Sequence, residues 1–412
     1  MKVFKFGGAS VRNASAIRQV ARILSQNTEG PLLVVISAMG KTTNALERVH
    51  AAFQNGKPAE AEIAQVVDYH RTIAEELMPA SAEAKKTIKE FEDALHREAA
   101  RQGGWDETYD QLVSWGEWVS TQLVSCYLRA QGISNLWLDA RTCIVTDANY
   151  REANVDWAAT TAHIQKLHWS APVLITQGFV GKAGNGLTTT LGRDGSDFSA
   201  AIFAHGLNAE SVTIWKDVPG VMNADPKRLP AAIVFEELPF KEAAEMTYYG
   251  ASVIHPKTIK PLANKGIPLW VKNFDNPALP GTRITECKVD HLPPLIVFKD
   301  NQCLVTCKVT DYTFVNEAQM STILQALAEH DVHINLLQNS AITFSFCADY
   351  REEKIMKLIA DLGKSFEVYY NTGLTLITVK NYDAATFQEY RARPGVLLEQ
   401  SSRSTLQVLV KS

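Results

Sequence analysis

Short apolar runs alternate with amphipathic stretches along the N-terminal two thirds of the chain. The runs are rich in Val, Ile and Leu, which is typical of strands buried on both faces, and they lie at 32–36, 136–138, 173–176 and 212–215. Between them, apolar residues recur at intervals of three and four, which predicts helices over about 60–78, 109–131, 155–167 and 196–206. Strands that alternate with helices predict crossover units and an open, mostly parallel sheet with helices on both faces.

The rhythm of the chain changes after a segment rich in proline, which predicts a domain boundary at about 285–296. Beyond it, strand and helix patterns follow one another in the order βαββαβ over 297–372, which is the ferredoxin-like α+β unit. A second copy begins with LTLITVK but runs out of chain before its last helix. We therefore expect one domain over 1–285, a complete small unit over 297–372 and a truncated one over 373–412.

The composition is that of an ordinary folded protein. Hydrophobic residues make up 46% and charged residues 21% of the 412 residues, a length that suggests two or three domains. The formal net charge of −4 gives no reason to expect nucleic acid or an anionic membrane as a partner. No apolar run approaches the roughly 18 residues of a membrane span, and MKVFKFGG lacks an apolar signal core, so a cytoplasmic protein is expected.

The six cysteines are scattered along the chain. Only Cys303 and Cys307 lie close together, and a zinc site would need two more ligands at comparable spacing nearby. We expect reduced, buried thiols, and we predict no metal-ligating residues.

The first of three glycine-containing turns is KFGGAS, at residues 5–10. Lys5 ends a strand, Gly7 and Gly8 let the backbone turn and approach a ligand, and Ser10 can cap the helix that follows. A lysine beside the N–H groups of a helix start is a plausible cradle for phosphate.

The second turn is SAMGKTTN, at 37–44, and the third is TTTLGRDGSD, at 188–197. The second resembles the end of a Walker A loop, but Val35 stands where the first glycine of that motif would be, so it is no P-loop. Each turn alone could be only structural. Three such turns after strands of one sheet predict a shared anion site at the carboxyl ends of those strands.

Two further features carry candidate chemistry. Glu117 lies between Trp115 and Trp118 in an otherwise apolar helix, and a lone carboxylate is expensive to bury unpaired. It is either exposed or ion-paired, or it binds the ammonium group of a ligand. Asp217 lies in IWKDVPGVMNADPK, which either wraps a nucleotide or is only a long connection.

Taken together, these motifs resemble the aspartate kinases of the amino-acid kinase superfamily. The resemblance covers nearly the whole chain and is carried, in order, by KFGGAS, SAMGKTTN, LVSWGEWVST, TQGFVG, TTTLGRDGSD, IWKDVPGV, ADP and IHP. Single glycine turns are shared with glutamate, carbamate and uridylate kinases. Glu117 in GEWVST, the third turn and a C-terminal pair that resembles ACT domains are more specific. The implied fold is an α/β amino-acid kinase domain followed by an α+β ACT pair.

The resemblance implies transfer of the ATP γ-phosphate to the β-carboxylate of L-aspartate, with Mg²⁺ bridging the phosphates. This is the first step of lysine, threonine and methionine synthesis. The implied catalytic residues are Lys5, which neutralises the transferring group, and Asp197. The implied aspartate pocket consists of Glu117 for the α-ammonium, Arg193 for the α-carboxylate, and Ser37, Thr43, Phe179 and Ser196. The implied ATP-binding residues are Lys5, Gly7, Gly8, Ser10, Lys216, Asp217, Met222, Lys227 and Lys257.

Several positions depart from the family pattern. Asp194 follows Arg193 where the family has glycine, and we expect its side chain to point away from the arginine. Met222, Lys227 and Ser252 replace an aromatic residue, an arginine and a lysine, so the nucleotide contacts are less typical than the aspartate contacts. Two alternatives stay open: an amino-acid-sensing regulator of the same fold with impaired catalysis, and a kinase for another small acid such as glutamate.

The ACT-like tail implies sensing of an end product. The expected effector is lysine or threonine, bound around FVNEAQM with the end of LLQNSA as its partner strand. ACT pairing between two chains implies a homodimer or a dimer of dimers. The alternative is a structural dimerisation module, because the second ACT-like unit is truncated.

Overall fold

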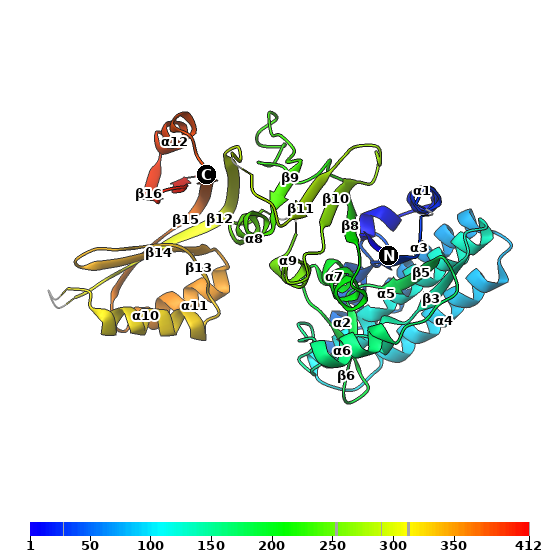
Figure 1. Ribbon diagram of the computed structural model, residues 1–412. Helices are drawn as coiled ribbons and strands as arrows, with labels where there is room; N and C mark the ends of the chain where they lie inside the picture. The colour runs from blue at the N-terminus through cyan, green and yellow to red at the C-terminus, as the bar shows by residue number, and fades with distance from the viewer. Residues whose placement is uncertain (28, 252–253, 290, 311–313, 412) are drawn as a thin grey trace. The chain divides into compact units, whose positions relative to one another are not determined.

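The computed structural model describes residues 1–27, 29–251, 254–289, 291–310 and 314–411 (Figure 1). The chain divides into two compact units, which are treated separately below. The N-terminal unit comprises Met1–Val221, Val234–Ala244 and Ser252–Val289. The C-terminal unit comprises Met222–Ile233, Glu245–Ala251 and Asp290–Ser412.

An eight-stranded sheet of order β3-β5-β2-β1-β8-β10-β11-β9 forms the centre of the N-terminal unit. Its strands are β1 (Lys2–Phe6), β2 (Leu32–Ile36), β3 (Asn135–Leu138), β5 (Val173–Gln177), β8 (Ser211–Lys216), β9 (Glu237–Pro239), β10 (Leu269–Asn273) and β11 (Thr282–Thr285). The first six strands in spatial order run parallel, and β11 is antiparallel to β10. The predicted fold class, an open and mostly parallel sheet, is confirmed.

Helices cover both faces of this sheet (Figure 1). One face packs against α1 (Ala14–Ser25), α2 (Thr42–Gln54), α3 (Glu60–Leu77), α4 (Ala82–Ala99) and α5 (Trp105–Ala130). The other face contacts α7 (Gly195–Leu207), which packs against α6 (Trp157–Gln165) and α9 (Pro256–Ala263). Side chains alternate along a strand, so Phe4 and Phe6 of β1 enter the first core and Lys5 points toward α7.

The remaining elements of this unit are short. A small sheet contains β4 (Val145–Thr146), β6 (Val180–Ala183) and β7 (Thr188–Thr190). Two 3₁₀ helices, η1 (Gly8–Val11) and η2 (Ala140–Thr142), follow β1 and β3. Helix α8 (Phe240–Tyr248) follows β9, and its residues up to Ala244 belong to this unit. Of the helices in the described part of the chain, none is both long and apolar enough to cross a lipid bilayer.

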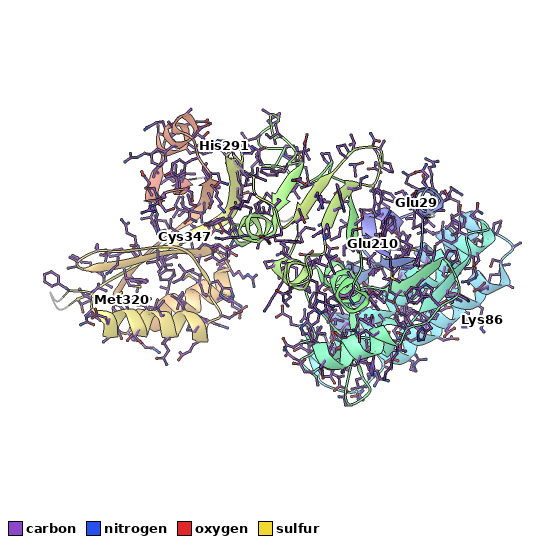
Figure 2. The ribbon with its side chains drawn as sticks, viewed as in Figure 1. Glu29, Lys86, Glu210, His291, Met320 and Cys347 are labelled. Carbon is purple, nitrogen blue, oxygen red and sulfur yellow. The ribbon has the colours of Figure 1, made fainter. Side chains whose placement is uncertain are left out.

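The C-terminal unit contains one six-stranded antiparallel sheet of order β13-β14-β12-β15-β17-β16. Its elements are β12 (Leu295–Lys308), α10 (Glu317–Glu329), β13 (Ile334–Asn339), β14 (Thr343–Asp349), α11 (Glu352–Leu362), β15 (Glu367–Lys380), α12 (Ala384–Arg391), β16 (Val396–Ser401) and β17 (Thr405–Lys411). The order βαββαβ predicted from the sequence is present from β12 to β15. Figure 2 shows Met320 on α10 and Cys347 on β14, which belong to two different cores of the unit.

Strands β12 and β15 each continue through both halves of this sheet. They pair over their whole length, with register shifts near Gln302, where Asn301 adopts a left-handed φ of 55°. On β15, Gly373 has a φ of 66° close to the same place. The sequence pattern predicts two separate strands around this glycine, and that prediction is wrong. Gly373 accommodates a bulge within one continuous strand instead of ending it.

The turns that follow β1 and β2 are held together by backbone contacts. The amide of Gly40 donates to the carbonyl of Gly8 at 3.0 Å, and the amide of Ser37 donates to the carbonyl of Phe6 at 3.1 Å. A methyl group on Gly8 would lie 2.8 Å from the carbonyl oxygens of both Ala38 and Gly40. The two turns can therefore approach this closely only because residue 8 has no side chain.

Gly8→Ala is expected to lower the free energy of unfolding by about 1–3 kcal/mol, because the clash is with backbone atoms that cannot rotate away. Urea denaturation measures the change. Gly184→Ala is the matched control, since nothing lies within 4 Å of the added methyl group there, and it should shift stability by less than about 0.5 kcal/mol. Equal stabilities of the two variants would contradict the close approach.

Candidate active site

Four of the predicted site residues lie at the carboxyl ends of four adjacent parallel strands of the central sheet. Lys5 precedes the last residue of β1, Ser37 follows β2, Phe179 follows β5 and Lys216 ends β8. The amide of Gly178 donates to the carbonyl of Ile36 at 3.1 Å, which links the turn after β5 to the one after β2. Ligand sites of open α/β sheets lie at this edge, and the sequence prediction of a shared site here agrees with that rule.

Asp197 on α7 forms a buried ion-pair cluster with two lysines. Its Oδ1 lies 2.6 Å from Lys5 Nζ, and its Oδ2 lies 3.5 Å from Lys216 Nζ. Burial alone would raise the pKa of Asp197, but the two ammonium groups outweigh that effect and hold its pKa below the ordinary value. The cluster thus fixes two cations at the ends of neighbouring strands, β1 and β8.

Glu117 lies in the middle of α5, and only 3% of it is exposed. Its Oε1 accepts a hydrogen bond of 3.3 Å from the amide of Ala38, whereas its Oε2 is buried and has no hydrogen-bond partner among the described residues. Burial raises the pKa of Glu117 to about 8, against the opposing effects of the Ala38 amide and of Lys5. A buried carboxyl oxygen without a partner is costly, so its presence indicates a ligand that donates to it.

Arg193 lies in the turn before α7, and its side chain is 78% exposed. Glycine and left-handed residues shape this turn, with a φ of 75° at Gly192 and 54° at Asp194. The positive φ explains why glycine suits position 194. The Asp194 carboxylate lies 3.8 Å from Arg193 Nε, which is longer than a hydrogen bond, and its side chain is about half-exposed. The two charges are close, but Asp194 does not lock the arginine in place.

The segment Gly178-Phe179 packs closely against the start of α7. A methyl group on Gly178 would lie 2.5 Å from Cβ of Ser196, so only glycine allows this approach. Phe179 has a left-handed φ of 72°, and its amide donates to Ser199 Oγ at 2.9 Å. These contacts place Ser196 and Phe179 beside each other.

A cavity of about 430 Å³ adjoins Arg193. Three predicted substrate-binding residues line it, namely Thr43, Phe179 and Arg193. The other lining residues are Glu47, Tyr109, Arg151, Glu152, Thr190 and Gly192. The structure therefore brings residues of α2, α5 and the turns around β7 to one space.

The other predicted nucleotide-binding residues are placed as follows. Gly7 precedes η1 as its N-terminal cap residue, and a methyl group added to Gly7 would lie 3.5 Å from Lys5 Nζ. Ser10 lies in η1 and is buried. Asp217 and Lys257 are exposed in the same unit. Met222 and Lys227 belong to the C-terminal unit, where Asp225 Oδ1 accepts from the amide of Lys227 at 2.9 Å. Ser252 lies outside the described residues.

Several site features were not found from the sequence. Asp110 on α5 is fully buried and accepts from the amide and hydroxyl of Thr190, at 2.8 and 2.7 Å, and from the amide of Arg151 at 3.0 Å. Burial raises the pKa of Asp110 to about 6. His255 is near enough to Arg193 and Asp194 for both charges to affect its pKa, which is lowered mainly by burial. Only the tertiary structure brings these residues to the site; an aspartate within a helical pattern was the one available signal.

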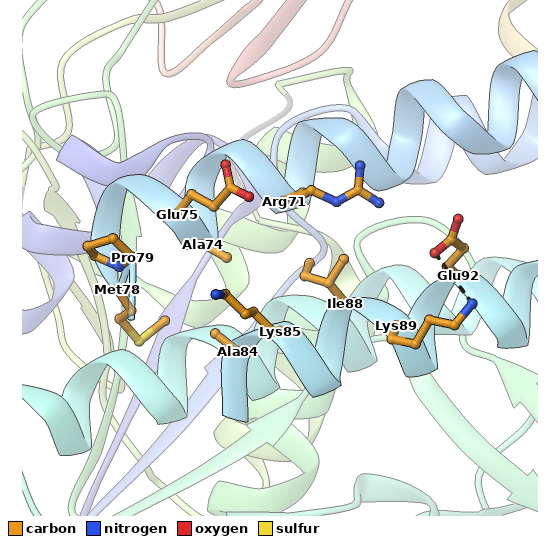
Figure 3. A pocket seen from close by; sticks show the side chains of 10 residues that line it. All are labelled: Arg71, Ala74, Glu75, Met78, Pro79, Ala84, Lys85, Ile88, Lys89 and Glu92. Carbon is orange, nitrogen blue, oxygen red and sulfur yellow. Dashed lines mark ion pairs between the residues drawn. The ribbon is translucent and has the colours of Figure 1, made fainter. Parts of the chain in front are cut away.

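A second cavity, of about 300 Å³, lies between α3 and α4 (Figure 3). Met78 and Ile88 contribute apolar surface together with smaller residues such as Ala74. Charged groups also line it, including Lys89 and Glu92, whose charged atoms are 3.8 Å apart. None of the predicted site residues lines this cavity. Elsewhere in the described chain, no group of three or more His, Cys, Asp or Glu side chains could hold a metal ion.

Comparison with known proteins links the chain to one family. The model of the amino acid kinase family matches residues 1–273. The chain is 32% identical to lysine-sensitive aspartokinase 3 of Escherichia coli, over 84% of this chain and 78% of that protein. This chain is also 30% identical to the chloroplastic bifunctional aspartokinase/homoserine dehydrogenase 1 of Arabidopsis thaliana. The match covers 96% of this chain but only 45% of that relative.

The structure is also similar to solved structures of E. coli aspartokinase III. The match to its complex with aspartate and ADP, described as the R-state, has a TM-score of 0.82 at 28% identity. The match to its complex with lysine and aspartate, described as the T-state, has a TM-score of 0.81 at 28% identity. Both matches cover 100% of this chain and 96% of the other.

The burial of Glu117 predicts a pH-dependent loss of stability. Its pKa is about 8 in the folded chain and 4.5 ordinarily, so between these values the folded state keeps a proton that the unfolded state releases. Stability should therefore fall as the pH rises through this window and be constant above it. Relative to Glu117→Gln, which cannot ionise, the protein should lose roughly 2–4 kcal/mol between about pH 5 and pH 8.5.

Denaturant titrations of both proteins at a series of pH values measure this difference. A constant offset between them across the window would show that Glu117 does not titrate as a buried carboxyl group.

Proposed function

Because the chain belongs to the amino acid kinase family and, within it, to the aspartokinases, we propose that it transfers the γ-phosphoryl group of ATP to the β-carboxylate of L-aspartate. The product is 4-phospho-L-aspartate, the first intermediate in lysine, threonine and methionine synthesis. The observation that carries this proposal is the buried, unpartnered carboxyl oxygen of Glu117 in the same site as a lysine-rich cluster. An amino acid supplies the ammonium group that Glu117 lacks.

The roles proposed for the substrate residues follow from charge. L-aspartate has one ammonium and two carboxylate groups, so its pocket needs both signs. Glu117 receives the α-ammonium, and Arg193, which is exposed and held only loosely by Asp194, is available to bind the α-carboxylate through its planar guanidinium. Ser37, Thr43, Phe179 and Ser196 complete the pocket.

The chemical step needs no general base, since a carboxylate with an ordinary pKa near ~3.9 is already ionised at neutral pH. An oxygen of the β-carboxylate attacks the γ-phosphorus, the bond to the β-phosphate oxygen breaks, and ADP leaves with that electron pair. The difficulty is to bring two anions together, which requires fixed cations and N–H groups. Asp197 holds Lys5 and Lys216 for this purpose, Gly7 lies beside Lys5, and the amides of Gly7 and Gly8 are the proposed N–H groups.

ATP and Mg²⁺ fit this arrangement in different ways. Lys5, Lys216, Ser10 and the two glycines suit the phosphates, and Asp217 and Lys257 of the same unit are the proposed contacts to the rest of the nucleotide. The nucleotide contacts expected of Met222 and Lys227 stay predictions. We propose that phosphate oxygens and water supply most of the ligands of Mg²⁺, which commonly keeps several waters beside substrate phosphates. Bound there, Mg²⁺ would neutralise phosphate charge.

The regulation that we propose rests on the C-terminal unit. Lysine or threonine is the proposed effector, and the E. coli aspartokinase III structure that contains lysine favours lysine. The proposed binding region joins 314–320 to 336–341, where the amide of Val315 donates to the carbonyl of Ala341 at 2.8 Å. Pairing of ACT-like units in a homodimer, the domain limits 1–285, 297–372 and 373–412, and a cytoplasmic location stay predictions.

The proposed reaction is tested by trapping its product. The protein is incubated with MgATP, L-aspartate and hydroxylamine, which converts an acyl phosphate to a coloured hydroxamate. We expect hydroxamate with aspartate and little with glutamate. Product with glutamate alone would assign the chain to another substrate, and aspartate binding without any product would assign it to the non-catalytic alternative.

Glu117→Gln is expected to lower kcat/KM for aspartate by about 100-fold or more, because a buried charged partner of the substrate ammonium is lost. Binding of ATP, measured by calorimetry, should change little. The control is Glu98→Gln, since Glu98 is also buried but pairs with Arg97 and Arg101 away from the site. A similar loss of ATP binding in Glu117→Gln would mean that Glu117 is structural.

A further inference from the structure

Arg151 is the second arginine in the cavity that Arg193 lines, and nothing in the sequence motifs assigns it a role. It belongs to the turn between β4 and α6, whereas Arg193 belongs to the turn between β7 and α7. The two turns are in backbone contact, because the amide of Ala153 donates to the carbonyl of Thr190 at 3.0 Å. A methyl group on Gly192 would lie 3.2 Å from the carbonyl oxygen of Arg151.

The backbone of Arg151 adopts a conformation that favours glycine. Its φ is 68°, in the left-handed region that a residue with a side chain rarely occupies. The hydrogen bond from its amide to Asp110, at 3.0 Å, is a backbone interaction that glycine would make equally well. Glycine would thus give the same local backbone without strain. The reason for an arginine at this position must therefore lie in what its side chain does.

The side chain of Arg151 is held at the wall of the cavity. Its guanidinium carbon lies 4.3 Å from the centre of the Tyr109 ring, and one nitrogen lies 3.4 Å from Asp106 Oδ1. Tyr109 in turn donates its hydroxyl hydrogen to Glu47 at 2.7 Å. The guanidinium group of Arg151 is thus oriented by the face of the Tyr109 ring, and that ring is itself fixed by its hydrogen bond to Glu47.

The charges of the cavity require a second cation if a carboxylate is to bind there. Arg193 is the one other basic side chain among the described lining residues, and two carboxylates, Glu47 and Glu152, also line the cavity. With Arg193 alone the lining would be net negative and would repel an anion. Arg151 adds a second guanidinium group to the lining, so that a planar carboxylate can be bound between two such groups.

We propose that Arg151 is a substrate-binding residue that shares the α-carboxylate of the amino-acid substrate with Arg193. This inference rests on the proposed function, because it concerns the same pocket. It extends that function by a residue from a turn that carries no motif of the family.

The left-handed backbone makes Arg151→Gly a clean test, because glycine removes the side chain without adding strain. We expect this variant to raise KM for L-aspartate by about tenfold or more, the effect of one lost charge-assisted hydrogen bond, with KM for ATP unchanged. Arg151→Lys keeps the charge but not the planar guanidinium group, so its KM for L-aspartate should lie between the values of the unsubstituted protein and of Arg151→Gly. Arg18→Ala is the control, because Arg18 is an exposed arginine that pairs with Glu76 and does not line this cavity, and its KM for L-aspartate should be unchanged.

A substrate without the α-carboxylate charge separates direct contact from an indirect effect. The α-amide of L-aspartate keeps the reacting β-carboxylate and the ammonium group. If Arg151 binds the α-carboxylate, the unsubstituted protein should already use the amide poorly, and Arg151→Gly should cause little further loss. The inference would be overturned if Arg151→Gly raised KM by the same factor for aspartate and for its amide. It would also be overturned if the variant changed the melting temperature but left KM for aspartate unchanged. If the unsubstituted protein formed no product from L-aspartate itself, the proposed reaction would be refuted instead.

Discussion

The site depends on one buried carboxylate, that of Asp197, which holds two lysines from neighbouring strands. A lysine at the edge of a sheet has a long and flexible side chain, and two lysines close together repel each other. The ion pairs to Asp197 reduce that repulsion and fix both ammonium groups at the carboxyl end of the sheet. Removal of this carboxylate would leave two cations competing for the same space, so the arrangement of the phosphate side of the site follows from it.

The opposite requirement governs the amino-acid side of the site. Glu117 is buried with one oxygen unpartnered among the described residues, and the free chain bears the resulting cost. Such a group is poorly suited to stability and well suited to a ligand that brings its own positive charge. Fixed cations for phosphate and a costly carboxylate for ammonium together describe a site that is complementary to an anionic nucleotide and a zwitterion.

The central sheet and some of the site residues could be predicted from the sequence, because they depend on local patterns of apolar residues and glycines. Apolar runs identified the parallel strands, and the glycine turns after two of them placed Lys5 and Ser37 at one edge of the central sheet. The prediction that the third turn, with Arg193, also follows a strand of that sheet is wrong, because it follows β7 of the small sheet. What the sequence could not reveal depends on distant pairing. The backbone amide of Arg151 donates to the carboxylate of Asp110, and no spacing along the chain indicates that contact. Likewise, the linear order of elements does not show that β12 and β15 run through both halves of the C-terminal sheet.

The most direct measurement of the central claim is the number of protons released when L-aspartate binds at pH 7. Calorimetric titrations in buffers of different ionisation enthalpy give this number. Glu117, with a pKa of about 8, is mostly protonated in the free protein and must ionise to receive the substrate ammonium. The account predicts release of close to one proton per bound aspartate, and none for Glu117→Gln. Tight binding of aspartate without proton release would contradict it.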